Sequence, residues 1–531
     1  MTDLELEEGC TSSSTSSSNS SDIARESYED YTPSISKWRM LALTLPNWGI
    51  QVVWLILMSY GTPYMVGLGM PNSLTTLVWL SGPLSGALIQ PLFASLSDRT
   101  QHPWGKRKPY IAGGASLVSL SLLGLACAED FSNWLSSTSS AHTHMYASGP
   151  PKASTLTKLL VAFWVCALNA TMQPLQGGVR ALIVDSCPAR QQSAAAAWSA
   201  RFNGLGAIAI SASAFADVET WAPALGETKF KALCVLAVLA LGLSIAPVCA
   251  FVPDEPSRDG AVQSHQRGAV SLLASLWRMR RELPPVTRQV CKVQFCAWMG
   301  WFTVLYYSTT YVYQIFVIDQ HVHLNPDIFG SADPHLIEMG KHAGTRASLV
   351  FASVTFASSL LLPLLARLSV LQQAPGGYVP SVTLCTLSLG RVWQLAHCLF
   401  AALMLLSWVV YTVPAATIIV GVLGVAWSIA SWAPYALIST EIASLKAREE
   451  ACVGLAEKEG RWAANWLDEN TAGIMAFHNM VISLPQICAA LGCTFLFKLV
   501  EMSGRDDPVA FAFKFAGIMA AAAAWMGRDL R

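Results

Sequence analysis

Long apolar runs, each of about 20 residues, recur along this chain from near residue 40 to its end. A helical run of that length crosses the ~30 Å hydrocarbon core of a bilayer, because each helical residue rises by about 1.5 Å. Composition agrees, since 53% of the residues are hydrophobic and only 13% are charged. The sequence predicts an all-α membrane protein with twelve transmembrane helices, at 40–61, 74–97, 109–128, 157–185, 193–215, 230–252, 286–318, 344–370, 388–411, 413–440, 472–499 and 508–527.

A polar segment rich in arginine separates the sixth run from the seventh and divides the helices into six plus six. This layout is typical of transporters in which two bundles move around a site near the middle of the membrane. The expected organisation is a disordered cytosolic tail at 1–36, an N-terminal six-helix bundle at 37–252, a cytosolic linker at 253–285 and a C-terminal six-helix bundle at 286–531.

The distribution of Lys and Arg predicts the orientation, because short cytosolic loops carry an excess of both. The loops on the side of the N-terminus hold most of them, so both termini are expected to be cytosolic in a multi-pass protein, of the plasma membrane rather than the vacuolar membrane. The totals of 34 basic and 34 acidic residues give no reason to expect a nucleic-acid partner. The thirteen cysteines lack the spacing of a metal site.

The turn after the second predicted helix, `SDRTQHPWGKRKP` (97–109), concentrates charge in an otherwise apolar region. One interpretation is that these charges only fix the orientation of the chain in the membrane. The other is an ion-pair latch that holds a cytosolic gate shut, with Gly105 permitting a tight turn. The candidate gate residues are Asp98, Arg99, Gly105, Lys106 and Arg107.

Three segments in the same order resemble one family of transporters. They are `SDRTQHPWGKRKPYIAGG` (97–114), `LQGGVRALIVD` (175–185) and `AWMGWFTVLYYSTTYVYQIF` (297–316). They are similar to motifs of the glycoside–pentoside–hexuronide cation symporters of the major facilitator superfamily, in the fungal form of the sucrose and α-glucoside proton symporters. The resemblance implies the major facilitator fold and import of a disaccharide together with a proton.

Asp185, at the end of the fourth predicted helix, is the candidate for proton coupling, because burial of a carboxyl disfavours its charged form. Arg190 is the expected conformation-dependent partner, and the resemblance places a family arginine there. Asn169 departs from the family, which usually has a second acid at this position. An amide can bind a sugar hydroxyl but cannot carry a proton, which weakens the symport interpretation and leaves sugar binding intact.

Sugar binding calls for aromatic rings, which cover the C–H face of a pyranose, and for polar groups, which bind its hydroxyls. Helix–helix packing is the alternative role for each such residue. The candidate substrate-binding residues are Asn47, Gln51, Trp54, Asn169, Gln173, Gln176, Arg180, Asn203, Trp298, Trp301 and Tyr306. His397, His478 and Glu441 are interpreted as packing or boundary residues.

The predicted function is therefore secondary active transport of sucrose or a maltose-like α-glucoside with a proton, by alternating access and as a monomer. No motif of a soluble enzyme is present in the sequence, and neither a cofactor nor a metal is expected. The alternatives are a sugar facilitator, a transporter of another glycoside or hexose, and a non-transporting sugar sensor with the same fold.

Overall fold

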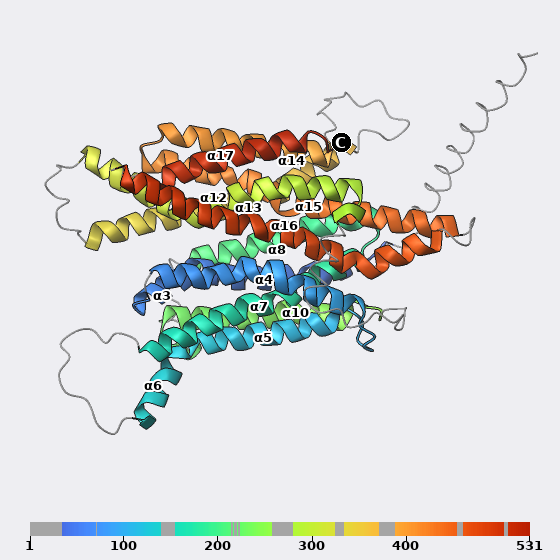
Figure 1. Cartoon of the computed structure of the whole chain (residues 1–531), viewed down its shortest axis with the longest axis horizontal. Coiled ribbons are helices and arrows are strands. Elements are labelled where there is room, and N and C mark those ends of the chain that lie inside the picture. Colours follow the sequence, from blue (N-terminus) through green and yellow to red (C-terminus); the bar gives the residue numbers. More distant parts are fainter. Residues whose placement is uncertain are drawn as a thin grey trace, which may run out of the picture.

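The computed structural model describes residues 34–70, 72–139, 154–213, 216, 220, 223–256, 280–323, 334–370, 388–453, 460–503 and 508–530. Within these ranges the regular structure is helical (Figure 1). The helices of the first half are α2 (Lys37–Thr44), α3 (Pro46–Gly67), α4 (Asn72–Asp98), α5 (Lys108–Ala126), α6 (Ala128–Ser139), α7 (Thr155–Ser186), α8 (Ala189–Ser213), η1 (Pro223–Leu225) and α10 (Lys229–Phe251). Those of the second half are α12 (Pro285–His323), α13 (Pro334–Val370), α14 (Leu389–Leu406), η4 (Ser407–Val409), α15 (Val413–Val453), α16 (Gly460–Met502) and α17 (Pro508–Gly527).

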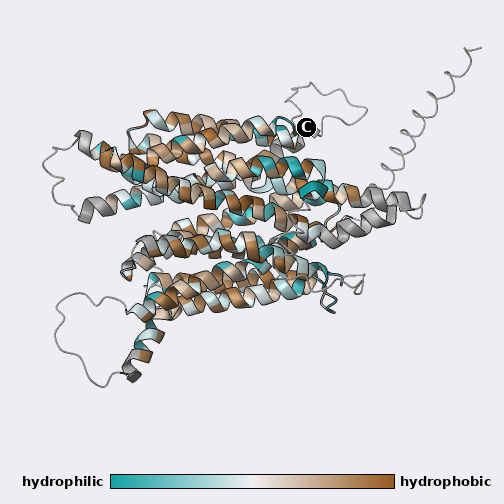
Figure 2. Ribbon diagram, in the orientation of Figure 1, coloured by the Kyte–Doolittle hydropathy of each residue, from teal (hydrophilic) through white to brown (hydrophobic). Residues whose placement is uncertain are grey.

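Each half of the chain has its own apolar core. One buried cluster draws its members from residues 43 to 252, and the other draws all but one of its members from residues 283 to 530. The exception is Val184 of α7, which packs against the core of the second half. Large apolar side chains such as Leu243, Ile418 and Phe495 are exposed, and lipid would cover them. Hydrophobic residues run along the helices of both halves (Figure 2).

Ten of the described helices are long and apolar enough to cross a membrane. The two remaining predicted spans, 193–215 and 286–318, correspond to α8 and α12, which form long helices but are less apolar than the others. α8 is rich in Ala and Ser, and α12 has polar residues at both ends. α8 packs against α3 of its own half and against α13 and α15 of the other, and α12 packs against α13, α15, α16 and α17 of its own half, so protein covers much of both helices.

Several boundaries differ from the prediction for identifiable reasons. The first span, expected at 40–61, is preceded by a separate short helix, α2, because Pro46 can begin a helix but has no N–H with which to continue one. α6 was not predicted, since its twelve residues are too few and too polar for a span. The predicted spans 413–440 and 472–499 are parts of longer helices, because α15 continues to Val453 and α16 already begins at Gly460.

The turn between α4 and α5, the start of α8 and the described C-terminal end lie at one end of the molecule, here called the charged end (Figure 1). Ile35, before the first helix, is also tied to this end, because its N–H donates to Gln191 Oε1 over 2.9 Å at the start of α8. α6 and the turn between α3 and α4 lie at the opposite end. The predicted tail, except for residues 34–36, and residues 257–279 of the predicted linker lie outside the described residues.

Candidate functional site: a charged gate and the interface above it

Arg107, in the turn between α4 and α5, is the centre of the charged end. Its side chain is fully buried, with 0% exposure. Nη2 forms an ion pair with Asp98 Oδ1 over 2.6 Å, and Nε donates to Asp185 Oδ2 over 3.0 Å. Nη1 donates to Ser97 Oγ over 2.9 Å. One guanidinium thus joins the ends of α4 and α7. The planar guanidinium of arginine has several N–H donors in a fixed geometry and suits this role better than the ammonium of lysine.

The predicted gate residues divide into two groups. Asp98 pairs with Arg107, and Lys106 pairs with Asp185, whose Oδ2 lies 3.4 Å from the lysine Nζ. Arg99, in contrast, is exposed at the end of α4. Burial of Arg107 acts to lower the pKa of its guanidinium, but the carboxylates of Asp98 and Asp185 outweigh burial and raise that pKa.

Asp254, in the first residues after α10, completes the gate and was missed from the sequence. Its Oδ2 accepts hydrogen bonds from the backbone N–H groups of Arg107 and Lys108, over 2.6 and 2.8 Å. These N–H groups begin α5, where an anion is favoured by the helix dipole. The carbonyl of Glu255 accepts from the N–H of Lys106 over 3.3 Å. Asp254 follows a long apolar run in the sequence, and no local pattern there connects it with the turn at residues 105–108.

Gly105 is required by this arrangement for two reasons. Its φ of +103° lies in a region that residues with a Cβ rarely adopt. A Cβ built at this position would also lie 2.3 Å from Cγ of Asp254. The tight turn predicted at Gly105 is therefore present, and the space beside the glycine holds the acid that anchors the turn.

Asp185 and Arg190 were expected to pair during transport. In this structure the carboxylate of Asp185 is instead shared by Arg107 and Lys106. Arg190 lies in the first turn of α8, and its side chain is outside the described part of the structure. The expected pairing with Arg190 therefore stays a prediction.

A second polar cluster joins the two halves nearer the middle of the membrane. Arg180 of α7 donates from Nη1 to Asn479 Oδ1 of α16 over 3.0 Å, and its guanidinium carbon lies 4.8 Å from the ring centroid of Tyr435 on α15. Asn479 Nδ2 in turn donates to the carbonyl of Gly86 on α4 over 3.3 Å. Arg180 thus faces the interior of the molecule rather than lipid, where a central arginine is costly.

Small residues continue this contact toward the charged end. Ala94 of α4, Ala181 of α7 and Ala476 of α16 form a buried cluster between the halves. A Cβ on Gly86 would lie 2.4 Å from Ser483 Oγ, so α4 and α16 are in close contact there. On the other side of the interface, Arg201 of α8 donates from Nε to the carbonyl of Ser359 over 3.4 Å. These contacts lie from the middle of the helices to the charged end, so the halves are closed over that portion.

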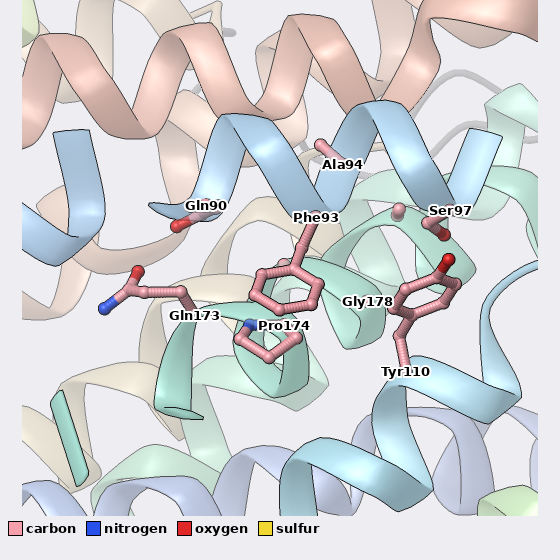
Figure 3. A pocket seen from close by; sticks show the side chains of 10 residues that line it. Gln90, Phe93, Ala94, Ser97, Tyr110, Gln173, Pro174 and Gly178 are labelled. Atoms are coloured by element: carbon pink, nitrogen blue, oxygen red, sulfur yellow. The ribbon is translucent and has the colours of Figure 1, made fainter. Parts of the chain in front are cut away.

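A small crevice lies beside this closed region, within the first half (Figure 3). Gln90 and Phe93 come from α4, Gln173 and Pro174 from α7, and Tyr110 from α5. Gln90 is buried, and its Oε1 has no hydrogen-bond partner among the described residues. Sequence reasoning found Gln173 here but missed Gln90, which lies in an apolar stretch of the second span without a periodic polar face.

The predicted substrate residues of the first half lie on α3, α7 and α8, and several have partners inside this half. Asn47 Nδ2 donates to Ser199 Oγ over 3.2 Å, which joins α3 to α8. Asn169 Nδ2 donates to Ser81 Oγ over 2.8 Å, and Gln173 Nε2 donates to the carbonyl of Asn169 over 2.9 Å. For Asn47 and Asn169 these contacts favour the packing alternative in this conformation. The remaining members, all partly exposed, are Gln51, Trp54, Gln176 and Asn203.

The three predicted aromatic residues of α12 do not share one environment. Trp301 is only 2% exposed, stacks on Phe400 with ring centroids 4.1 Å apart and packs edge-on against Trp427. It belongs to the core of the second half in this conformation, and its assignment to a sugar-binding face stays a prediction. Trp298 and Tyr306 are partly exposed, and each retains one aromatic neighbour.

Cysteines and acids give no sign of a metal centre. In the ranges that the structure describes, no group of three or more His, Cys, Asp or Glu residues could hold a metal ion. The cysteines there are free, and Cys166 and Cys488 are exposed.

Two six-helix halves, each with its own core and closed upon one another over part of their length, define a membrane transporter with the major facilitator fold. Solved transporters of this superfamily share it. The proton:xylose symporter XylE superposes with a TM-score of 0.52 at 12% identity, over 96% of each chain. The transporter FucP in its outward conformation superposes with a TM-score of 0.50 at 15% identity, over 93% of this chain and 98% of that one.

Relatives in sequence narrow the assignment. A General alpha-glucoside permease of Schizosaccharomyces pombe is 26% identical over 571 aligned positions, covering 96% of each chain. Sucrose transport protein SUC4 of Arabidopsis thaliana is 24% identical over 77% of this chain and 79% of its own length. Sucrose transport protein SUT3 of Oryza sativa is 28% identical, but over only 53% of this chain and 56% of its own length. No protein-family model matches the chain.

These relatives confirm the resemblance drawn from the three motifs. The chain is similar over most of its length to an alpha-glucoside permease and to a sucrose transport protein, and it shares the fold of symporters of the major facilitator superfamily. The relatives carry the names of permeases and transport proteins, not of enzymes.

Proposed function

We propose that this chain imports an α-glucoside, sucrose or a maltose-like disaccharide, together with a proton. The observation that carries the proposal is the near full-length similarity to a General alpha-glucoside permease in a chain whose halves meet from the middle of the membrane to the charged end. A transporter whose two halves are in contact over one portion, and can separate there, has the geometry that alternating access needs.

The charged end is the cytosolic end in this proposal, because Lys and Arg gather there. Both termini are then cytosolic, and the structure represents a state closed to the cytosol. The gate consists of the ion pairs of Arg107 and Lys106 with Asp98 and Asp185. Opening of the gate separates Asp185 from its two cations, and a carboxyl that loses its cationic partners in an apolar site takes up a proton more readily. Asp185 thus links gate opening to proton movement.

The sugar occupies the space between the halves on the side away from the closed contacts. Arg180 and Asn479 form its floor, and the partly exposed Gln51, Gln176, Trp298 and Tyr306 supply hydrogen bonds and ring faces. The proton is the only ion required, no cofactor takes part, and the protein works as a monomer in the plasma membrane.

Uptake of labelled sucrose and maltose tests the proposal in yeast cells that lack their own transporters. Wild type and Asp185→Asn are compared at pH 5 and pH 7.5, with and without a protonophore. Proton symport requires uptake that is stimulated by acid, sensitive to the protonophore and lost in the variant. Uptake unaffected by all three changes would indicate a facilitator. No uptake of either sugar would contradict the substrate assignment and favour another glycoside, a hexose or a sensor.

A further inference from the structure

His478 of α16 is a buried imidazole that the gate described above does not use. It is 0% exposed, and neither ring nitrogen has a hydrogen-bond partner among the described residues. A buried polar side chain without a partner is costly, and such groups concentrate where a protein changes state. His478 precedes Asn479, which holds Arg180 across the interface between the halves.

The environment of His478 contains one cation and few other titratable groups. Its ring packs edge-on against Tyr435 of α15 with centroids 5.1 Å apart, and the same tyrosine ring receives Arg180 from α7. α4 presents Gly86 and Ala94 to this part of α16, neither of which titrates. Glu441, further along α15, is held by the N–H groups of Val286 and Thr287 and by the Thr287 hydroxyl. No carboxylate among the described neighbours is therefore placed to neutralise a charged His478.

Protonation of this ring would place a second cation beside Arg180 in a site that water does not reach. Two like charges repel strongly at low effective dielectric. Because α7 and α16 belong to different halves, the repulsion is relieved by separating them, which breaks the Arg180–Asn479 bond. In the separated state both cations reach water, so the charged ring is tolerated there.

We infer that His478 is a proton-binding group of the interface between the halves, and that its protonation opens the contact at Arg180 and Asn479. This inference rests on the proposed proton-coupled transport, and it assigns a proton site to α16. The gate at Arg107 and the interface at Arg180 then respond to protons through different groups.

A reporter cysteine tests the inference without depending on any sugar. Ala94→Cys lies in the closed contact between α4, α7 and α16. Its reaction with a membrane-permeant maleimide is measured in the full chain in proteoliposomes, above the background of the chain without this substitution. The reactions compare pH 5.5 with pH 7.5, the interval over which an imidazole changes charge. The intrinsic effect of pH on the reaction of a thiol with maleimide is measured on free cysteine. The labelling rates of the protein are divided by this effect.

The corrected labelling of Ala94→Cys is expected to rise by about fivefold at the lower pH, and His478→Gln should abolish the rise. His397→Gln is the matched control, because His397 is equally buried in α14 but packs on Trp393 within the second half, away from the interface. The control should keep the rise. His478→Asn provides a second variant if the glutamine chain does not fold.

Two results would overturn the inference. One is a rise with acid that persists in both His478 variants. The other is labelling that is high at both pH values in those variants, which would mean that the ring only packs the interface. Because labelling needs no sugar, a wild type that labels as expected but shows no acid-stimulated uptake would contradict the proposed symport and leave the assignment of His478 standing.

Discussion

Arg180 on α7 and Asn479 on α16 are 299 positions apart in the chain, yet the guanidinium Nη1 of the first donates to Oδ1 of the second over 3.0 Å. This bond joins the two halves of the transporter. It also connects a residue that sequence analysis assigned to the substrate with one that it did not consider. The strength of this contact should therefore control how easily the halves separate.

Asn479→Asp is expected to slow the transport cycle by about tenfold, because an ion pair with Arg180 in a poorly hydrated interface is stronger than a hydrogen bond with an amide. Asn479→Ala should weaken the contact between the halves instead of strengthening it, since it removes a bond that contributes about 1 kcal/mol. Counterflow of labelled sugar in proteoliposomes measures both. Equal rates in the two variants would show that this contact does not limit the cycle.

Asp98→Asn should lower the maximal rate of uptake by about tenfold and change KM by less than about twofold. The variant leaves buried Arg107 with Asp185 but without its 2.6 Å partner, so the gate closes less readily after each opening. Initial rates over a range of sugar concentrations check this expectation. Asp130→Asn is the control, because Asp130 forms an exposed ion pair with Lys231 in the other end of the molecule. A raised KM with a normal maximal rate would contradict a gating role for Asp98.

Gly105→Ala is expected to destabilise the protein by about 1 to 3 kcal/mol, because a side chain there combines an unfavourable φ with a clash against Asp254. Gly113→Ala is the matched control in α5, since a Cβ at Gly113 meets no atom within 4 Å. Thermal unfolding of the purified proteins in detergent gives the comparison. The interpretation of the turn would be wrong if both variants unfolded at the same temperature.

Trp301→Ala should lower stability by about 3 to 5 kcal/mol, because it removes a ring that stacks on Phe400 and packs edge-on against Trp427. Trp301→Phe keeps most of the packing and should leave KM for sugar unchanged. Thermal unfolding and uptake kinetics of the two variants separate a core role from a binding role. A large rise in KM for Trp301→Phe at normal stability would restore Trp301 to the substrate site.

The sequence predicted the fold well because the bilayer imposes a simple length and polarity rule on each span. It also identified the turn at 97–109, since charge in an apolar chain is conspicuous there. It was less informative about which face of a helix meets protein, lipid or a cavity. Trp301 and Trp298 are three residues apart and equally aromatic, and only the position of α14 and α15 decides that Trp301 is covered.

Pairings across long separations were the other missing part. Asp254 holds the start of α5 through two backbone hydrogen bonds, and no local spacing connects residue 254 with residues 107 and 108. Sequence analysis interpreted His478 as a packing or boundary residue and did not consider Asn479, although the two form an adjacent polar pair in an otherwise apolar run. Its significance depends on Arg180, which the sequence places on a different helix.

The bonds from Asp254 and Glu255 to the turn between α4 and α5 also bear on where the chain can be divided. The first half does not end where α10 ends at Phe251, since it includes the residues that anchor its own gate. A chimaera joined to a related transporter directly after α10 would separate the turn from its matched anchor. A chimaera joined after Glu255 would carry both together, so exchange of halves between such proteins should respect this later boundary.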